Sequence, residues 1–235
     1  MMRPSDPLSG VLALPGVAET ASQAQDFLAA LTRQHLRGWE KAAAETSRRA
    51  ARCSALLEGA SLREREEDDP DPLLAGAVRV AEELGRLGQT WRRAPLQVLA
   101  RLHTLAAADL DIPVEQLGRP KADPEVGARL TALAELVAGG TQAPAPVLAS
   151  IAHGEILALQ PFGAADGLVA RAASRLTLVA TGSDPRDLAL PESFWLRSGR
   201  AYRQRLDGYA AGTQDGVRAW VLFCCQGILS SGEQA

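Results

Sequence analysis

The sequence predicts an all-α protein with a single domain of about eight helices. Apolar residues recur at helical spacing along most of the 235-residue chain. Aromatic residues make up only 4% of it, and β-branched clusters that alternate with polar residues are scarce. Proline and glycine fall between the periodic segments, where they end helices rather than interrupt them.

The composition excludes several classes of protein. A hydrophobic fraction of 46% and a charged fraction of 23% are typical of an ordinary globular protein. The net charge of −3 argues against a nucleic-acid partner, since such proteins carry a basic excess. Three cysteines (Cys53, Cys224 and Cys225) are too few for a disulfide framework. No apolar run is long enough to span a membrane, so we expect a cytoplasmic protein without a membrane partner.

The N-terminal part is predicted to contain one long helix. Residues 1–19 are expected to be flexible. From residue 20 to 57 the pattern is helical, and Gly59 follows as a stop signal. Its broad apolar face consists of Phe27, Leu28, Leu31, Leu36 and Trp39. Charges and prolines fill residues 64–72, which predicts a solvated surface loop rather than a segment that binds a basic partner.

The remaining helices are separated by clear breaks. Asp123 and Pro124 supply an N-cap and a first helical residue, and Gln160-Pro161 ends another helix. The predicted helices span residues 73–91, 95–109, 124–138, 146–159, 166–181, 191–209 and 213–229. We expect a helical core over residues 20–182, with residues 183–235 forming C-terminal helices packed on it.

Residues 160–171 carry a recognisable pattern. They read Gln-Pro-Phe-Gly-Ala-Ala-Asp-Gly-Leu-Val-Ala-Arg, which is a helix break, a loop of small residues and the start of a new helix. The first turn of that helix leaves backbone N–H groups free, and such a terminus attracts anions such as phosphate.

This segment resembles the motif of the Fic (Fido) family, His-Pro-Phe-x-Asp/Glu-Gly-Asn-Gly-Arg-x-x-Arg. Pro161, Phe162, Gly167 and Arg171 match it. Family members typically transfer AMP from ATP onto a hydroxyl group of a protein. The resemblance implies that Phe162, Gly163, Gly167 and Arg171 bind a nucleotide or another anion. His153, seven residues before the motif, and the Leu102-His103 pair also match positions that the family often occupies with these residue types.

A second similarity lies far away in the sequence. Ser54-Ala55-Leu56-Leu57-Glu58-Gly59 fits the Ser/Thr-x-x-x-Glu-Gly/Asn pattern of the family's inhibitory helix. The resemblance implies an inhibitory-type helix over residues 46–59, with Ser54, Glu58 and Gly59 as its signature. Glu58 would then pair with Arg171, which would block a nucleotide's γ-phosphate. The alternative, which we favour over phosphate recognition by Arg171, is a buried ion pair that holds the first long helix against the motif helix.

Five residues differ from the family motif at positions where the family's residues take part in its activity. Gln160 stands where the family has its general-base histidine, and a carboxamide has no titratable proton acceptor. Ala164 replaces the metal-binding carboxylate, and Leu168 replaces the first arginine. Asp166 replaces the asparagine; it would cap the helix and fill the anion site with negative charge. Ala165 replaces the central glycine, which reduces the freedom of the loop.

We therefore predict that no catalytic residue is intact. The expected function is that of a Fic-like binding or regulatory module that has lost nucleotide transfer, with a protein partner of unknown identity. We expect no metal ion, Mg²⁺ included, and no resident cofactor. We expect at most weak binding of ATP or another nucleotide. One alternative is an active nucleotidyl- or phosphoryl-group transferase in which Asp166 or His153 acts as the base. Another is a structural or oligomerisation module.

Overall fold

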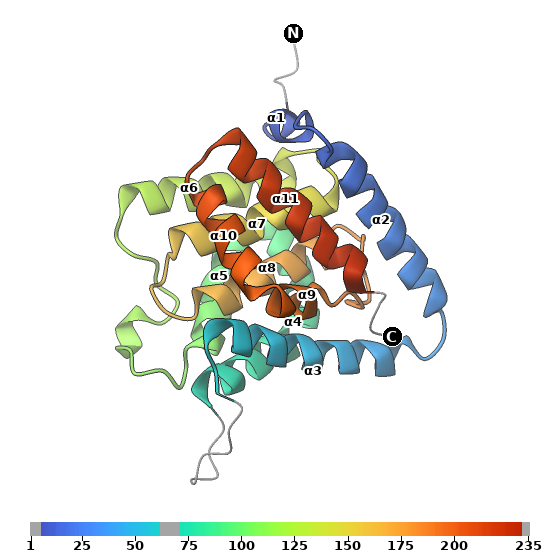
Figure 1. Ribbon diagram of the computed structural model, residues 1–235. Helices are drawn as coiled ribbons and strands as arrows, with labels where there is room; N and C mark the ends of the chain where they lie inside the picture. Colours follow the sequence, from blue (N-terminus) through green and yellow to red (C-terminus); the bar gives the residue numbers. More distant parts are fainter. Residues whose placement is uncertain (1–5, 62–70, 232–235) are drawn as a thin grey trace.

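The computed structural model describes residues 6–61 and 71–231. Within these ranges it contains eleven α-helices, one 3₁₀ turn, one π turn and no strand, which confirms the all-α prediction. The helices are α1 (Ser9–Leu12), α2 (Val17–Gln34), α3 (Trp39–Glu58), α4 (Pro72–Arg93), α5 (Pro95–Ala106), α6 (Pro124–Glu135), α7 (Ala145–Leu159), α8 (Asp166–Ala180), α9 (Pro191–Arg197), α10 (Gly199–Ala210) and α11 (Gln214–Leu229) (Figure 1). None of these described helices combines the length and the apolar character needed to cross a membrane.

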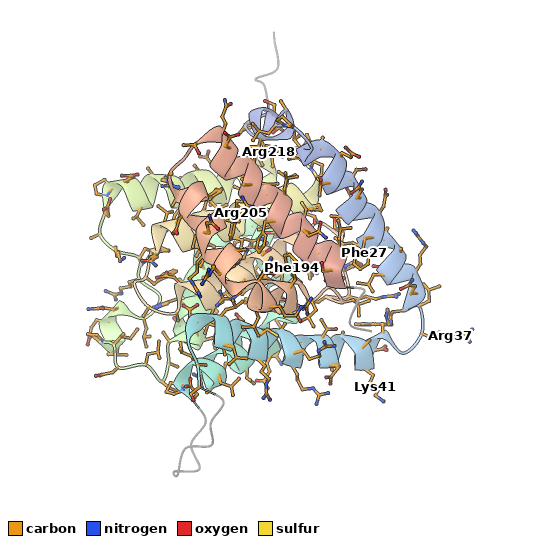
Figure 2. All side chains as sticks on the ribbon, viewed as in Figure 1. Phe27, Arg37, Lys41, Phe194, Arg205 and Arg218 are labelled. Carbon is orange, nitrogen blue, oxygen red and sulfur yellow. The ribbon has the colours of Figure 1, made fainter. Side chains whose placement is uncertain are left out.

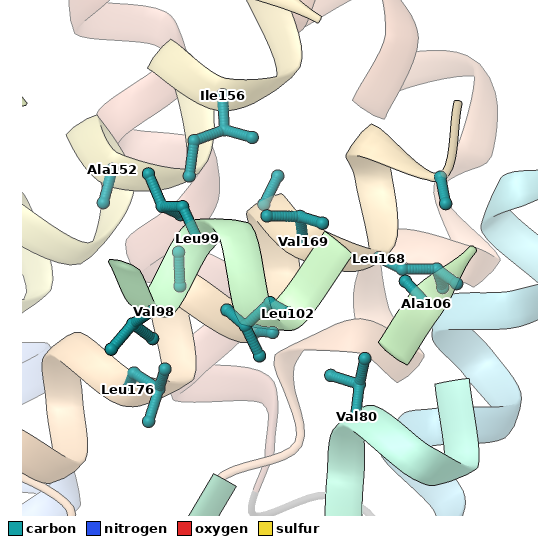
Figure 3. Packing of buried hydrophobic residues seen from close by; sticks show 14 of the residues in the cluster. Val80, Val98, Leu99, Leu102, Ala106, Ala152, Ile156, Leu168, Val169 and Leu176 are labelled. Carbon is teal, nitrogen blue, oxygen red and sulfur yellow. The ribbon is translucent and has the colours of Figure 1, made fainter. Parts of the chain in front are cut away.

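Helix α8 lies at the centre of the fold. Every residue from Asp166 to Leu178 is buried, because α3, α4, α5 and α7 all pack around it. Its apolar side chains form one core cluster with α4 and α5, in which Leu102, Val169 and Leu176 are completely buried (Figure 3). The polar groups of a helix that is buried on all sides must find hydrogen-bond partners within the protein. The partners of its charged residues therefore show how the site is built.

A second cluster joins the two ends of the chain. Helix α11 lies between α2 and α10 and also contacts α7 and α9 (Figure 1). Phe27 of α2 packs against this cluster, and the ring of Phe194 in α9 lies 5.1 Å from that of Phe223 in α11 (Figure 2). The predicted C-terminal helices are therefore packed on α2, α3 and α7.

Two predicted helices are each broken in two. The predicted helix 20–57 is α2 and α3, which diverge from a corner at residues 35–38 (Figure 1). Gly38 makes the turn with a φ of +67°, a conformation that costs a residue with a side chain about 1 kcal/mol or more. Leu36, predicted on the apolar face, is consequently 66% exposed. Helix 191–209 is likewise divided at Ser198 into α9 and α10.

The N-terminal prediction is wrong for the described residues 6–19. Leu8 and Val17 are buried, and the Asp6 carboxylate accepts hydrogen bonds from Thr141 and Gln142, so this segment is fixed to the core. The predicted acidic loop 64–72 lies outside the described residues except for its last two. Of these, Asp71 caps α4 by accepting a hydrogen bond from the Leu73 N–H at 2.9 Å.

Candidate functional site

The loop between α7 and α8 reverses the chain with three residues in the left-handed region. Gln160, Gly163 and Ala165 have φ values of +44°, +81° and +53°. The carbonyl of Pro161 accepts a hydrogen bond from the Lys121 N–H at 2.7 Å, which ties the loop to the segment before α6. This backbone path turns the amides of the loop inward, toward the start of α8.

Asp166 occupies those amides with its own side chain. Its carboxylate accepts hydrogen bonds from the N–H groups of Phe162 at 2.9 Å and Gly163 at 2.7 Å. The side chain is buried, and burial raises the pKa of Asp166 to about 6; the two amides and the positive charge of Lys121 oppose the rise. The sequence predicted that Asp166 would cap α8. Ala165 is the N-cap instead, and Asp166 is the first helical residue, with its carboxylate turned back to the loop.

A second carboxylate covers the start of α8. Glu58, the last residue of α3, accepts hydrogen bonds from the Gly167 N–H at 3.1 Å and from Nη2 of Arg171 at 2.8 Å. A Cβ atom at Gly167 would lie 2.0 Å from Oε2 of Glu58, so only glycine allows this approach. The contact expected between Glu58 and Arg171 is therefore present, across 113 residues of sequence.

Arg171 is fully engaged by the protein. It is 2% exposed, and its Nε and Nη2 donate to the hydroxyl and the carbonyl of Ser54 at 2.6 Å and 2.9 Å. Nη1 donates to the hydroxyl of Tyr202 at 3.4 Å. Gly59, in contrast, ends α3 with a φ of +104° and donates its N–H to the carbonyl of Leu56 within the same helix at 3.1 Å.

The two histidines that matched the family are both buried. The ring of His103 stacks on that of Phe162 at 4.3 Å, and its Nδ1 accepts a hydrogen bond from the Gly118 N–H at 2.9 Å. Burial lowers the pKa of His103. His153 is completely buried, which lowers its pKa well below the ordinary value, and it bonds to Tyr202 rather than to the loop. Neither ring faces solvent, where an incoming hydroxyl group would have to bind.

The remaining motif positions offer little chemistry. Gln160 is exposed at the end of α7, Ala164 presents only a methyl group, and Leu168 is buried in the core cluster of α8. In residues 6–61 and 71–231, no group of three or more His, Cys, Asp or Glu side chains is arranged to hold a metal ion. Ala164, at the position where the family motif has a carboxylate, provides no side-chain metal ligand.

Comparison with solved structures identifies the fold. A Fic family protein from Desulfovibrio desulfuricans G20 has a similar crystal structure, with a TM-score of 0.75 at 16% sequence identity. The similarity covers 94% of this chain and 74% of that one, so it extends beyond residues 20–182 into the C-terminal helices. This chain therefore has the Fic fold. No protein-family model matches the sequence, and no curated protein matches it.

Sequence reasoning missed Tyr202. The only signal is its spacing of seven residues from Tyr209, which puts both rings on one face of an otherwise polar helix and predicts that they are buried. That pattern carries no information about Arg171, which is 31 residues away.

Proposed function

We propose that this Fic-fold protein has lost nucleotide transfer and acts as a binding or regulatory module. The observation that carries the proposal is the occupation of the anion site by the protein's own carboxylates. Asp166 takes the amides of Phe162 and Gly163, and Glu58 takes the amide of Gly167 together with Arg171. A phosphate group would have to displace negative charge from each of these positions.

The residues around the loop support the same proposal. Gln160 cannot accept a proton, and general-base catalysis contributes roughly 10²- to 10⁴-fold to a rate. Ala164 supplies no metal ligand, and Leu168 supplies no cation. The loss of all three groups leaves a folded loop without the means to activate a hydroxyl group or to neutralise a triphosphate.

One observation favours a second candidate, an enzyme with altered chemistry. The pKa of Asp166, raised to about 6, suits a general base that works near neutral pH. Its geometry opposes that role, because the side chain is 5% exposed and both oxygens accept hydrogen bonds from the loop.

Transfer of label from nucleotides tests the proposal directly. The wild type and Glu58→Gly are incubated with labelled ATP, CTP, GTP or UTP, Mg²⁺ and a cell lysate. We expect no covalent label with either protein, even where Glu58→Gly opens the site. Label that is lost in Asp166→Asn and survives in Gln160→Ala would establish the altered enzyme instead.

Binding measurements separate the module from a purely structural role. Calorimetry with each nucleotide, with and without Mg²⁺, is compared with the oligomeric state in analytical ultracentrifugation. We expect Glu58→Gly to bind an anion that the wild type does not bind. No binding in either protein, together with a concentration-dependent dimer, would favour an oligomerisation module.

A further inference from the structure

A buried row of polar groups connects the C-terminal helices to Arg171. The hydroxyl of Tyr202, on α10, lies 2.7 Å from Nε2 of His153 on α7 and 3.4 Å from Nη1 of Arg171 on α8. On the other side of the imidazole, Nδ1 lies 3.9 Å from Sγ of Cys224 on α11. Four helices thus contribute one residue each, and all four residues are buried.

The direction of the hydrogen bond with Arg171 follows from the chemistry of the two groups. A guanidinium only donates, so the oxygen of Tyr202 accepts from Arg171. The same hydroxyl forms a hydrogen bond with Nε2 of His153, so both partners meet at one oxygen atom. Burial and the charge of Arg171 keep the pKa of His153 low, which favours the neutral ring.

Aromatic rings fix the histidine in place. The centroid of the His153 ring lies 4.5 Å from that of Trp195 and 5.0 Å from that of Trp220. The ring of Tyr202 contacts the same two tryptophans, at 5.9 Å and 5.7 Å. Both polar side chains are packed between these rings, which holds the hydroxyl of Tyr202 beside Arg171.

The guanidinium of Arg171 is planar and rigid, so fixing one edge sets the direction of the other. Nη1 donates to the hydroxyl of Tyr202, while Nη2 donates to Glu58 and to the carbonyl of Ser54. We propose that Tyr202 is a positioning residue, through which α10 and α11 keep Arg171 directed at Glu58 and the start of α8. The inference deepens the proposed function by making the C-terminal helices part of the site, but its first test requires no ligand.

Tyr202→Phe is compared with Tyr209→Phe, a matched control on the same helix. Tyr209 is also buried, and its hydroxyl donates to Oε1 of Glu155 at 2.7 Å, so each substitution removes one buried hydroxyl and one short hydrogen bond. Of the two tyrosines, only Tyr202 forms a hydrogen bond with Arg171. A general loss of packing or stability would therefore affect both variants alike.

The readout is nuclear magnetic resonance of Arg171 and His153. We expect exchange of the Arg171 Nη1 protons with solvent to accelerate by roughly tenfold or more in Tyr202→Phe, because Nη1 loses its buried acceptor, the hydroxyl of Tyr202. The ¹⁵N shifts of His153 should also change, since Nε2 loses its hydrogen-bond partner. Tyr209→Phe should stay close to the wild type in both measurements. Equal exchange of Arg171 in the two variants would overturn the inference.

Binding of pyrophosphate gives an independent measurement in the Glu58→Gly background. Adding Tyr202→Phe should weaken binding by roughly tenfold, the equivalent of one lost hydrogen bond to a charged group, and adding Tyr209→Phe should leave it unchanged. Equal weakening by both would contradict the positioning role. If Glu58→Gly itself binds no pyrophosphate, the anion binding expected under the proposed function fails, and the exchange of Arg171 still decides the role of Tyr202.

Discussion

Replacing Glu58 with glutamine tests whether the charge that reaches the start of α8 stabilises the fold. Glutamine keeps the length of the side chain and removes its charge. In the wild type, one carboxylate oxygen accepts from the Gly167 N–H and the other from Arg171. A carboxamide has one acceptor oxygen, so its NH₂ group must face one of these donors. Glu58→Gln therefore leaves either an amide or a buried guanidinium without its partner.

The expected loss is about 2 kcal/mol in the free energy of unfolding. Removing one partner of a fully buried ion pair costs roughly 3–5 kcal/mol. The side chain of Glu58 is 19% exposed, and Arg171 keeps its bonds to Ser54, so we expect a loss below this range. For a chain of this length the melting temperature should then fall by about 4–8 °C.

Urea and thermal denaturation measure this effect, with Glu45→Gln as the control. Glu45 lies on the same helix and pairs with Arg48, but its side chain is 53% exposed, so its loss should cost no more than about 0.5 kcal/mol. If Glu58→Gln is destabilised no more than Glu45→Gln, the Glu58–Arg171 contact does not stabilise the fold and the reasoning is wrong.

Three further changes probe the loop. The pKa of Asp166 is about 6, against an ordinary 3.8, so the native state keeps a proton that the unfolded chain has released. The free energy of unfolding should fall by on the order of 2 kcal/mol as the pH rises from about 4 to 6, and urea titrations of Asp166→Asn should lack this slope. Gly167→Ala should cost about 2 kcal/mol in thermal denaturation, because its Cβ would displace Glu58, and less in a Glu58→Ala background. Ala165→Gly should raise the free energy of unfolding by up to about 1 kcal/mol, and with it the urea midpoint, since Ala165 has a φ of +53°. A lower midpoint would show that this conformation is not strained.

The sequence predicts most helices closely where proline or glycine marks their ends. The helix expected over 146–159 is Ala145–Leu159, and the one expected over 166–181 is Asp166–Ala180. The breaks at Gly38 and Ser198 were missed because neither carries an unambiguous signal. A single glycine within a helical pattern is often tolerated, and serine is neutral in a helix. In the fold, α3 packs on α9 and α10 packs on α7, which are contacts between segments distant in the sequence that no local pattern shows.

The site was predictable in part. The proximity of Glu58 and Arg171 follows from a family resemblance at both positions, since no local pattern connects residues 113 apart in the sequence. The backward turn of the Asp166 carboxylate depends on a left-handed alanine before it, and alanine gives no sign of that conformation. The contact of Tyr202 with Arg171 depends on how α10 packs on α7 and α8, which is set by the whole tertiary fold.

The loop before α8 is already ordered around negative groups that belong to the chain itself. An external anion can therefore bind there only by exchange, in which one carboxylate leaves its amides as the newcomer arrives. The affinity measured for such a ligand is the difference between how strongly the amides bind the external anion and how strongly they bind the protein's own carboxylate. A weak affinity at this end of α8 would thus reflect competition within the molecule, and not a lack of donors to hold the ligand.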